Sequence, residues 1–199
     1  MVRRDPDQRR RDVAQAVWRV VRRGGLEQAS VRNVAQEAGL SMGSLRHYFA
    51  TQTELLAFTL RTVIERIEHR IAVLPADPAP RRRAERALLE LLPMDAERAA
   101  ENEVWLAFTA RAQVDADLRA VRDEGYTALR GGCRALVQDL APGRPETETE
   151  VATDRLHALL DGLAVHMATN PGVITADRAR AVIAAHLDDL TKADGLQAT

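Results

Sequence analysis

The stretch AGLSMGSLRHYF, residues 38–49, gathers side chains that suit contacts with another molecule better than burial in a protein core. Ser41 and Ser44 carry hydroxyls that donate or accept hydrogen bonds, and Arg46 carries a planar guanidinium with several donors. Positions 46–49 then hold Arg, His, Tyr and Phe in succession. Such groups bind the phosphate oxygens and base edges of nucleic acids, so the stretch predicts a nucleic-acid contact.

Two short helices are predicted to position these side chains, one over residues 31–38 and one over residues 42–49. Ser30 and Ser41 stand where N-caps are needed. Gly39 lies at the turn, where a left-handed backbone conformation costs glycine little. A small residue, Ala35, precedes that glycine by four positions, and the apolar Leu45 follows it by six. This spacing is the specification of a helix-turn-helix.

In a helix-turn-helix the second helix enters the DNA major groove, with its first turn nearest the bases. Gly43 would let the helix backbone approach the groove floor, Met42 could contact a thymine methyl group, and Ser44 could donate to or accept from a base edge. Arg46 could bind guanine through two hydrogen bonds or hold a phosphate, and the base is slightly favoured.

The end of the second helix suits the DNA backbone. His47 and Tyr48 are expected to bind phosphate oxygens, which fix register without reading sequence. Packing against the preceding helix is the alternative for Tyr48. Phe49 is expected in the core.

Charge is distributed unevenly along the 199 residues, although the net charge is only −1. Residues 1–50 hold ten Arg and five acidic residues, a net of +5, whereas the remaining 149 residues hold 18 basic and 24 acidic side chains, a net of −6. A basic head on an acidic body fits a head that meets a polyanion. Solvated Arg-rich helix faces are the alternative.

Apolar residues recur at helical spacing through the rest of the chain, and nothing alternates with the period of a strand. Further helices are predicted near residues 6–24, 52–74, 81–92, 96–114, 116–140, 147–169 and 176–190. The expected fold is all-α with about nine helices. Residues 1–50 would form a three-helix DNA-binding domain, and residues 51–199 an antiparallel helical bundle for ligand binding and dimerisation, linked by the helix that starts at 51.

The run SVRNVAQEAGLSMGSLRHYFATQTELL, residues 30–56, strongly resembles the DNA-binding module of TetR-family transcriptional repressors. Residues 105–118, WLAFTARAQVDADL, and residues 158–166, ALLDGLAVH, resemble the ligand and dimer domain of the choline-responsive BetI branch. The resemblance implies that DNA-contacting positions are occupied by Ser30, Ser41, Ser44, Arg46, His47 and Tyr48.

Two positions depart from the family pattern. The family often has Lys where this chain has Met42 and Gln52, and that Lys grips phosphate. Losing both cations is expected to weaken backbone affinity, because each phosphate contact adds to the salt-dependent part of binding. Arg32 or the Arg-rich arm Arg3 to Arg11 would compensate, although the arm could equally be disordered.

Dimerisation is expected because one helix-turn-helix reads only a few base pairs, and two copies can hold two half-sites. The last two long helices would form a four-helix bundle with those of a second copy, as the family resemblance implies; one broad intrachain core is the alternative. The expected interface residues are Leu156, Leu159, Leu160, Leu163, Val182, Ile183, His186, Leu187 and Leu190.

A small-molecule effector is expected in a cavity between the helices of the body. Aromatic, sulfur-containing and aliphatic side chains that could line it are Trp105, Phe108, Tyr126, Leu129, Cys133 and Met167. Most of them would be ordinary core residues in another helical protein. The effector itself is not identified by the sequence.

Enzymatic chemistry is not supported. His157 and His166 lie nine residues apart, on opposite sides of a helix, and cannot share a metal ion. Cys133 is the single cysteine, so no intrachain disulfide can form and a cytoplasmic location is expected. No membrane segment, metal or other cofactor is expected.

The expected function is therefore a homodimeric repressor that holds a palindromic operator on double-stranded DNA and is released by the effector. A regulator without a ligand, constitutive or activating, and a helical protein–protein adaptor remain as alternatives.

Overall fold

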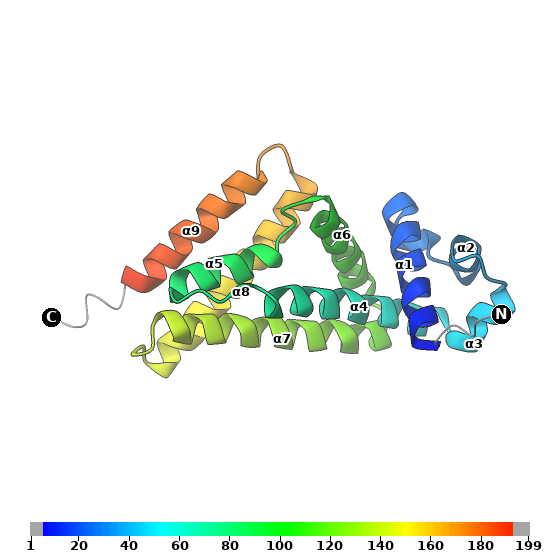
Figure 1. The fold of residues 1–199 in the computed structure, drawn as a ribbon, viewed down its shortest axis with the longest axis horizontal. Coiled ribbons are helices and arrows are strands. Elements are labelled where there is room, and N and C mark those ends of the chain that lie inside the picture. The colour runs from blue at the N-terminus through cyan, green and yellow to red at the C-terminus, as the bar shows by residue number, and fades with distance from the viewer. Residues whose placement is uncertain (1–5, 193–199) are drawn as a thin grey trace. The chain divides into compact units, whose positions relative to one another are not determined.

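The computed structural model describes residues 6–192, and every regular element in this range is a helix (Figure 1). Nine α-helices and one 3-10 helix, η1, follow one another, and no strand occurs between residues 6 and 192. Their bounds are α1 (Pro6–Gly24), η1 (Leu26–Gln28), α2 (Val31–Glu37), α3 (Met42–Tyr48), α4 (Gln52–Ala72), α5 (Pro80–Glu90), α6 (Ala96–Arg111), α7 (Ala116–Leu140), α8 (Glu146–Thr169) and α9 (Ala176–Lys192). The predicted all-α class is confirmed.

Helix boundaries agree with the predicted ones to within about three residues. The 3-10 turn η1 was not predicted. The start of the Arg-rich arm lies outside the described residues. None of the helices described between residues 6 and 192 is both long and apolar enough to cross a membrane.

The chain divides into two compact units. Unit 1 contains the chain up to Arg66 together with Glu103–Glu124, and unit 2 contains Ile67–Asn102 together with the chain from Gly125 onward. Helices α4, α6 and α7 each contribute residues to both units. These divisions fall within helices rather than in loops, so no break in the helical pattern of the sequence marks them.

Capping side chains set the starts of several helices, among them the two for which Ser30 and Ser41 are the predicted N-caps. The hydroxyl oxygens of Ser30, Ser41 and Thr175 accept hydrogen bonds from the backbone N–H three residues further on. Asp115 does the same for α7, accepting from the N–H of Leu118. These caps satisfy donors that the first turn of a helix leaves without a partner.

A capping box precedes α4, with one change from the standard motif. Thr51 Oγ1 accepts from the Glu54 N–H at 3.0 Å, as in that motif. The Glu54 carboxylate, however, accepts from the N–H of Ala50 at 2.9 Å rather than from Thr51. The reciprocal bond thus reaches back one residue further than in the standard motif and fixes the segment that joins α3 to α4.

The core of unit 2 is formed by residues of α5, α7, α8 and α9, and α9 packs against both α5 and α8. Fully buried members of this core include Leu88, Leu156, Ile183 and Leu187. Asn102 ties α6 to α8 by donating a hydrogen bond from its side-chain amide to the carbonyl of Ala164 at 2.8 Å.

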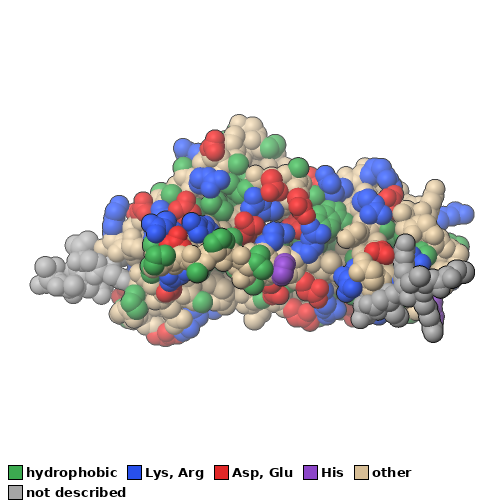
Figure 2. All heavy atoms as spheres, viewed as in Figure 1, with side chains coloured by type: hydrophobic (Ala, Val, Ile, Leu, Met, Phe, Trp, Pro, Cys, Tyr) green, Lys and Arg blue, Asp and Glu red, His purple; other side chains and the backbone are tan. Residues whose placement is uncertain are grey.

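Ion pairs join helices within each unit, and Figure 2 shows basic and acidic side chains interspersed over one face. In unit 2 the buried Glu101 lies 2.6 Å from Arg70, which also lies 3.2 Å from Glu90. Arg98 bonds to Glu90 at 3.0 Å. The hydrogen bond with Glu101 is the largest of the effects that raise the pKa of Arg70.

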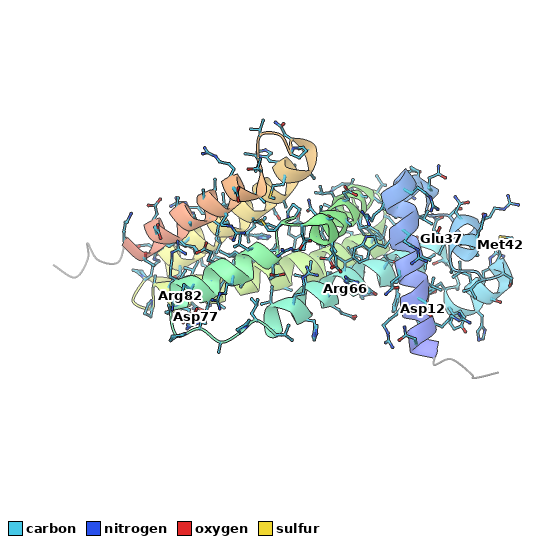
Figure 3. All side chains as sticks on the ribbon, turned by 45° about the horizontal axis from the view of Figure 1, so that its top comes forward. Asp12, Glu37, Met42, Arg66, Asp77 and Arg82 are labelled. Atoms are coloured by element: carbon cyan, nitrogen blue, oxygen red, sulfur yellow. The ribbon has the colours of Figure 1, made fainter. Side chains whose placement is uncertain are left out.

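Asp77 organises the start of α5, whose own N-cap position, Ala79, has no side-chain acceptor. Asp77 is only 8% exposed, and its carboxylate accepts from the Ala79 N–H at 2.9 Å and from Arg82 at 3.0 Å. Arg86 lies 3.3 Å away. Figure 3 shows Asp77 and Arg82 beside each other at this helix start. The hydrogen bond from Arg82, followed by that from Ala79, lowers the pKa of Asp77 to about 2.

We therefore expect Asp77→Asn to lower the melting temperature by several degrees at neutral pH, because the ionised carboxylate is the form that the folded chain favours. A pKa lowered on folding contributes stability above the unfolded value, near 3.8, and this contribution is lost as the pH falls through about 2. The difference in melting temperature between wild type and variant should accordingly shrink between about pH 4 and pH 2. Thermal unfolding followed by circular dichroism over this range measures it.

Glu68→Gln is the matched control, since Glu68 is an exposed carboxylate on α4. It should leave the melting temperature nearly unchanged at every pH. A gap between wild type and Asp77→Asn that stays constant down to pH 2 would contradict the assignment of the stabilisation to the ionised carboxylate.

Candidate nucleic-acid interface

Helices α2 and α3 form a helix-turn-helix inside unit 1 (Figure 1). Gly39 at the turn has a φ of 65°, the left-handed conformation that favours glycine. The N–H of Leu40 closes the turn by donating to the carbonyl of Ala35 at 2.8 Å. Ala35 and Leu45 are both buried, so the two short helices meet over the apolar centre that the sequence predicted.

Helix α3 buries one side and exposes the other. Leu45 and the following Phe49 are buried, whereas Arg46 and His47 are exposed and Met42 is 50% exposed. Figure 3 shows Met42 at the outer edge of unit 1, on the first turn of α3. The helix thus has an open polar face that its own unit does not cover.

Tyr48 combines features of both roles considered for it, phosphate binding and packing within the protein. Its side chain is half-buried, and its ring meets that of His47 edge-on at 5.6 Å between centroids. The hydroxyl-bearing ring is therefore partly supported by the protein and partly available at the surface.

Packing within the chain does not require a glycine at position 43. A Cβ built on it would meet only the hydroxyl oxygen of Ser41, at 3.9 Å, which is ordinary van der Waals contact. Glycine within a helix costs about 1 kcal/mol relative to alanine. The missing side chain therefore costs stability without relieving any contact of the folded chain.

The serine hydroxyls of α3 are partly engaged. Ser41 Oγ accepts from the Ser44 N–H at 3.0 Å and shares a hydrogen bond with Ser44 Oγ at 2.9 Å. Since each hydroxyl has one donor and two acceptor positions, the exposed pair keeps further capacity for an outside partner. Ser30 is half-buried and caps α2 through Asn33.

Gln52 was predicted to face DNA, and the structure uses its side chain within unit 1. Its amide nitrogen donates to the backbone carbonyl of Ala29 at 2.9 Å. This bond ties the first residue of α4 to the segment before α2. No local pattern predicts this bond, because the two residues are distant along the chain.

Acidic residues neutralise some of the arginines of unit 1. Glu37 on α2 accepts from Arg19 at 2.7 Å and from Arg23 at 3.0 Å, both on α1. These two hydrogen bonds, Arg19 first, lower the pKa of Glu37. Within the described part of the chain, Arg32 and Arg46 are exposed and form no ion pair. They are the cations that the predicted interface can offer to phosphate or bases.

Arg10 on α1 belongs to the Arg-rich arm considered for phosphate contact, and its aromatic contacts were not predicted. It lies over the rings of Phe49 and Phe58, and no local spacing signals a contact between residues so distant in sequence.

The six residues predicted to line an effector cavity are divided between the units. Trp105 and Phe108 belong to unit 1; Tyr126, Leu129, Cys133 and Met167 belong to unit 2. The last two are buried in the core of unit 2, against which Leu129 packs.

Polar groups accompany these side chains in unit 2. The ring of Tyr126 lies 5.5 Å from that of His157, and His157 Nε2 lies 3.7 Å from the carboxylate of Asp161. Burial, and then the charge of Asp161, raise the pKa of the Cys133 thiol to about 12. Among the described residues no three His, Cys, Asp or Glu side chains are grouped as metal ligands would be.

Most of the predicted dimer-interface residues are buried within unit 2 itself. Six of the nine belong to its hydrophobic core: Leu156, Leu160, Leu163, Ile183, Leu187 and Leu190. These six side chains face the other helices of the same chain, as the alternative of an intrachain core expects, and their contact with a partner stays a prediction. Leu159, Val182 and His186 are only partly buried. The sides of α8 and α9 that remain open carry Val151, Ala158, Val165, Ala181 and Ala185.

Comparison with known proteins agrees with this architecture. Residues 15–58 match the model of the bacterial regulatory proteins of the tetR family, and residues 80–192 match the model of the C-terminal domain of BetI-type transcriptional repressors. The HTH-type transcriptional regulator PksA of Bacillus subtilis is 39% identical over 194 residues, covering 96% of this chain and 93% of PksA. The HTH-type transcriptional regulator BetI of Vibrio atlanticus is 30% identical, covering 92% of each chain.

Solved structures show the same fold. A transcriptional regulator from Rhodococcus superimposes with a TM-score of 0.84 at 30% identity, covering 93% of this chain and 97% of that one. A putative transcriptional regulator from Saccharomonospora viridis, solved in complex with choline, has a TM-score of 0.80 at 22% identity, covering 94% of this chain and 96% of that one. With its helix-turn-helix in unit 1 and both family models matched, this chain belongs to the TetR family of DNA-binding transcriptional regulators, which are not enzymes, and carries a BetI-type C-terminal domain.

Proposed function

We propose that the protein is a repressor that binds a palindromic operator as a homodimer and leaves it when a small molecule binds the C-terminal body. DNA reading is supported by the exposed outer face of α3. On that face Gly43 has no side chain, although the folded chain has room for one. Met42, Ser44 and Arg46 would meet base edges in the major groove. The exposed His47 and the half-buried Tyr48 would hold phosphates.

The contacts around the reading helix are assigned by the same reasoning. Arg32 would supply a phosphate contact, as an exposed cation on α2 without an ion pair in the described chain. Ser30 and Ser41 would bind DNA through the hydrogen-bonding positions of their hydroxyls that capping does not use. Gln52 would act through its bond to Ala29, holding the start of α4, rather than as a substitute for a phosphate-gripping lysine.

The effector part rests on the BetI-type body. Within unit 2 the aromatic ring of Tyr126, the His157–Asp161 pair and the buried Cys133 bring polar and apolar groups together. The choline-bound regulator of the same fold supports a body that holds a small molecule. A compound that raises the melting temperature and releases DNA would distinguish this repressor from a constitutive regulator.

Selection of bound fragments from a random DNA pool tests the proposed DNA binding directly. We expect a palindrome whose half-site centres are one helical turn apart, about 34 Å, or a multiple of this distance, because two symmetry-related copies of α3 must enter successive major grooves. Enrichment of a single unrepeated half-site would contradict the dimeric arrangement, and no enrichment at low salt would contradict DNA reading.

Gly43→Ala should separate stability from DNA binding. The added methyl group has room in the free protein and favours the helix by about 1 kcal/mol, so we expect a melting temperature about 2 to 4 °C higher. The same methyl group would meet the groove floor, so operator affinity should fall at least about tenfold. Thermal unfolding and fluorescence anisotropy with the selected operator measure the two effects.

Gly131→Ala is the matched control, since Gly131 lies in the exposed middle of α7, and a Cβ there would meet nothing within 4 Å. It should stabilise the protein to a similar extent and leave operator affinity unchanged. If Gly43→Ala bound the operator as tightly as wild type, the close approach of α3 to DNA would be refuted.

Val165→Arg tests whether the dimer forms along the open sides of α8 and α9. Val165 is 38% exposed on α8, and a dimer along the open sides of α8 and α9 would bury it. Two unpaired guanidinium groups in a symmetric interface should raise the dimer dissociation constant at least about 100-fold. Sedimentation velocity should show a monomer, and operator affinity should fall because the dimer is lost.

Val173→Arg is the control, at a 63% exposed position between α8 and α9, and it should remain a dimer. An intact dimer of Val165→Arg would exclude an interface along the open sides of α8 and α9.

A further inference from the structure

Arg10, on α1, contacts the corner at which the reading helix ends. Its guanidinium carbon lies 4.8 Å from the ring centroid of Phe49 and 5.0 Å from that of Phe58. The two rings are themselves in contact, with centroids 5.3 Å apart. A guanidinium at this distance from an aromatic ring is attracted to its negative face. Arg10 therefore joins α1 to the residue that follows α3 and to α4 in a single contact.

The same side chain reaches the polar side of that corner. Arg10 Nη2 lies 3.7 Å from one carboxylate oxygen of Glu54, and the other oxygen of Glu54 accepts from the Ala50 N–H at 2.9 Å. Phe49 and Ala50 are the two residues between the end of α3 and the capping box of α4. Both the apolar and the polar anchor of this short link are thus in contact with one arginine.

The environment of Arg10 differs from that of a cation ready to bind phosphate. About 36% of its side chain is exposed, and its Nε is buried without a hydrogen-bond partner among the described residues. A residue whose role was to bind DNA backbone would present its donors to solvent. Arg32 and Arg46, both exposed and without an ion pair in the described range, have that character instead.

We propose that Arg10 is a positioning residue for sequence reading: it fixes the orientation of α3 within unit 1 by holding Phe49, Phe58 and Glu54 together, and it does not itself bind DNA. This inference rests on the proposed reading role of α3. A misdirected α3 would lose its contacts to base edges first, because these need an accurate approach. Phosphate contacts, which depend mainly on charge, would tolerate the change better.

Arg10→Met tests this role, since methionine keeps apolar bulk on the rings and removes the charge. Affinity for the selected operator and for a duplex with altered half-sites is measured by fluorescence anisotropy over a series of salt concentrations. We expect about tenfold weaker operator binding and a similar loss of the ratio between operator and altered duplex. The slope of the logarithm of affinity against the logarithm of salt concentration should equal that of wild type, because no phosphate contact is removed.

Arg11→Met is the matched control. It removes the same charge one position away, from an exposed side chain that bonds only to Gln8 in the described structure. It should leave the ratio between operator and altered duplex unchanged. Arg10→Lys keeps a cation for the rings and should recover most of that ratio, which also provides a folded variant if Arg10→Met is too unstable to assay.

Two results would overturn the proposal. A slope reduced by about one with an unchanged ratio would make Arg10 a phosphate contact. Unchanged affinity and ratio in Arg10→Met, or a ratio in Arg10→Lys that is reduced as far as the loss expected for Arg10→Met, would show that the cation over the rings does not position α3. Wild-type binding is measured first, so a failure of the proposed DNA reading would be seen separately, as an absence of sequence-selective binding by the unmodified chain.

Discussion

A helix of seven residues is not stable by itself in water, and the reading helix α3 has that length. Its conformation must come from groups outside it. At its start Ser41 satisfies a backbone donor, and on its inner side Leu45 packs into the apolar centre shared with α2. At its end Phe49 is buried. Because all support comes from one side and from the two ends, the outer face can stay open, and it is this face that can meet DNA.

The need for support from outside α3 also explains the many hydrogen bonds and ion pairs around α2, α3 and the start of α4. Glu37 connects α2 to α1 through two arginines, and Gln52 connects the start of α4 to the segment before α2. Exposed ion pairs contribute little individually, typically less than about 1 kcal/mol. Here each one joins elements that are short or distant in sequence, so together they limit the orientations available to the helix pair.

Local features of the sequence were sufficient for much of this account. Serine, threonine and aspartate at helix starts, glycine at a left-handed turn and apolar spacing act within a few residues, so the helices and the helix-turn-helix could be predicted. An apolar stripe shows that a helix face is covered but not by which chain, and for this reason Leu156, Ile183 and Leu187 were assigned to a partner although they lie in the core of unit 2. The contacts of Arg10 and Gln52, and the division of the chain at Arg66, depend on residues distant in sequence and left no local pattern.

The state of the single thiol has a practical consequence. Cys133 is buried, and its pKa of about 12 leaves almost no thiolate at neutral pH, which is the form that reacts with alkylating reagents and disulfides. In the folded protein Cys133 should therefore react very little with thiol-directed labels. A cysteine introduced at an exposed position of α3 or α8 would be the reactive one, and a fluorophore or spin label could be attached there without first removing the native residue.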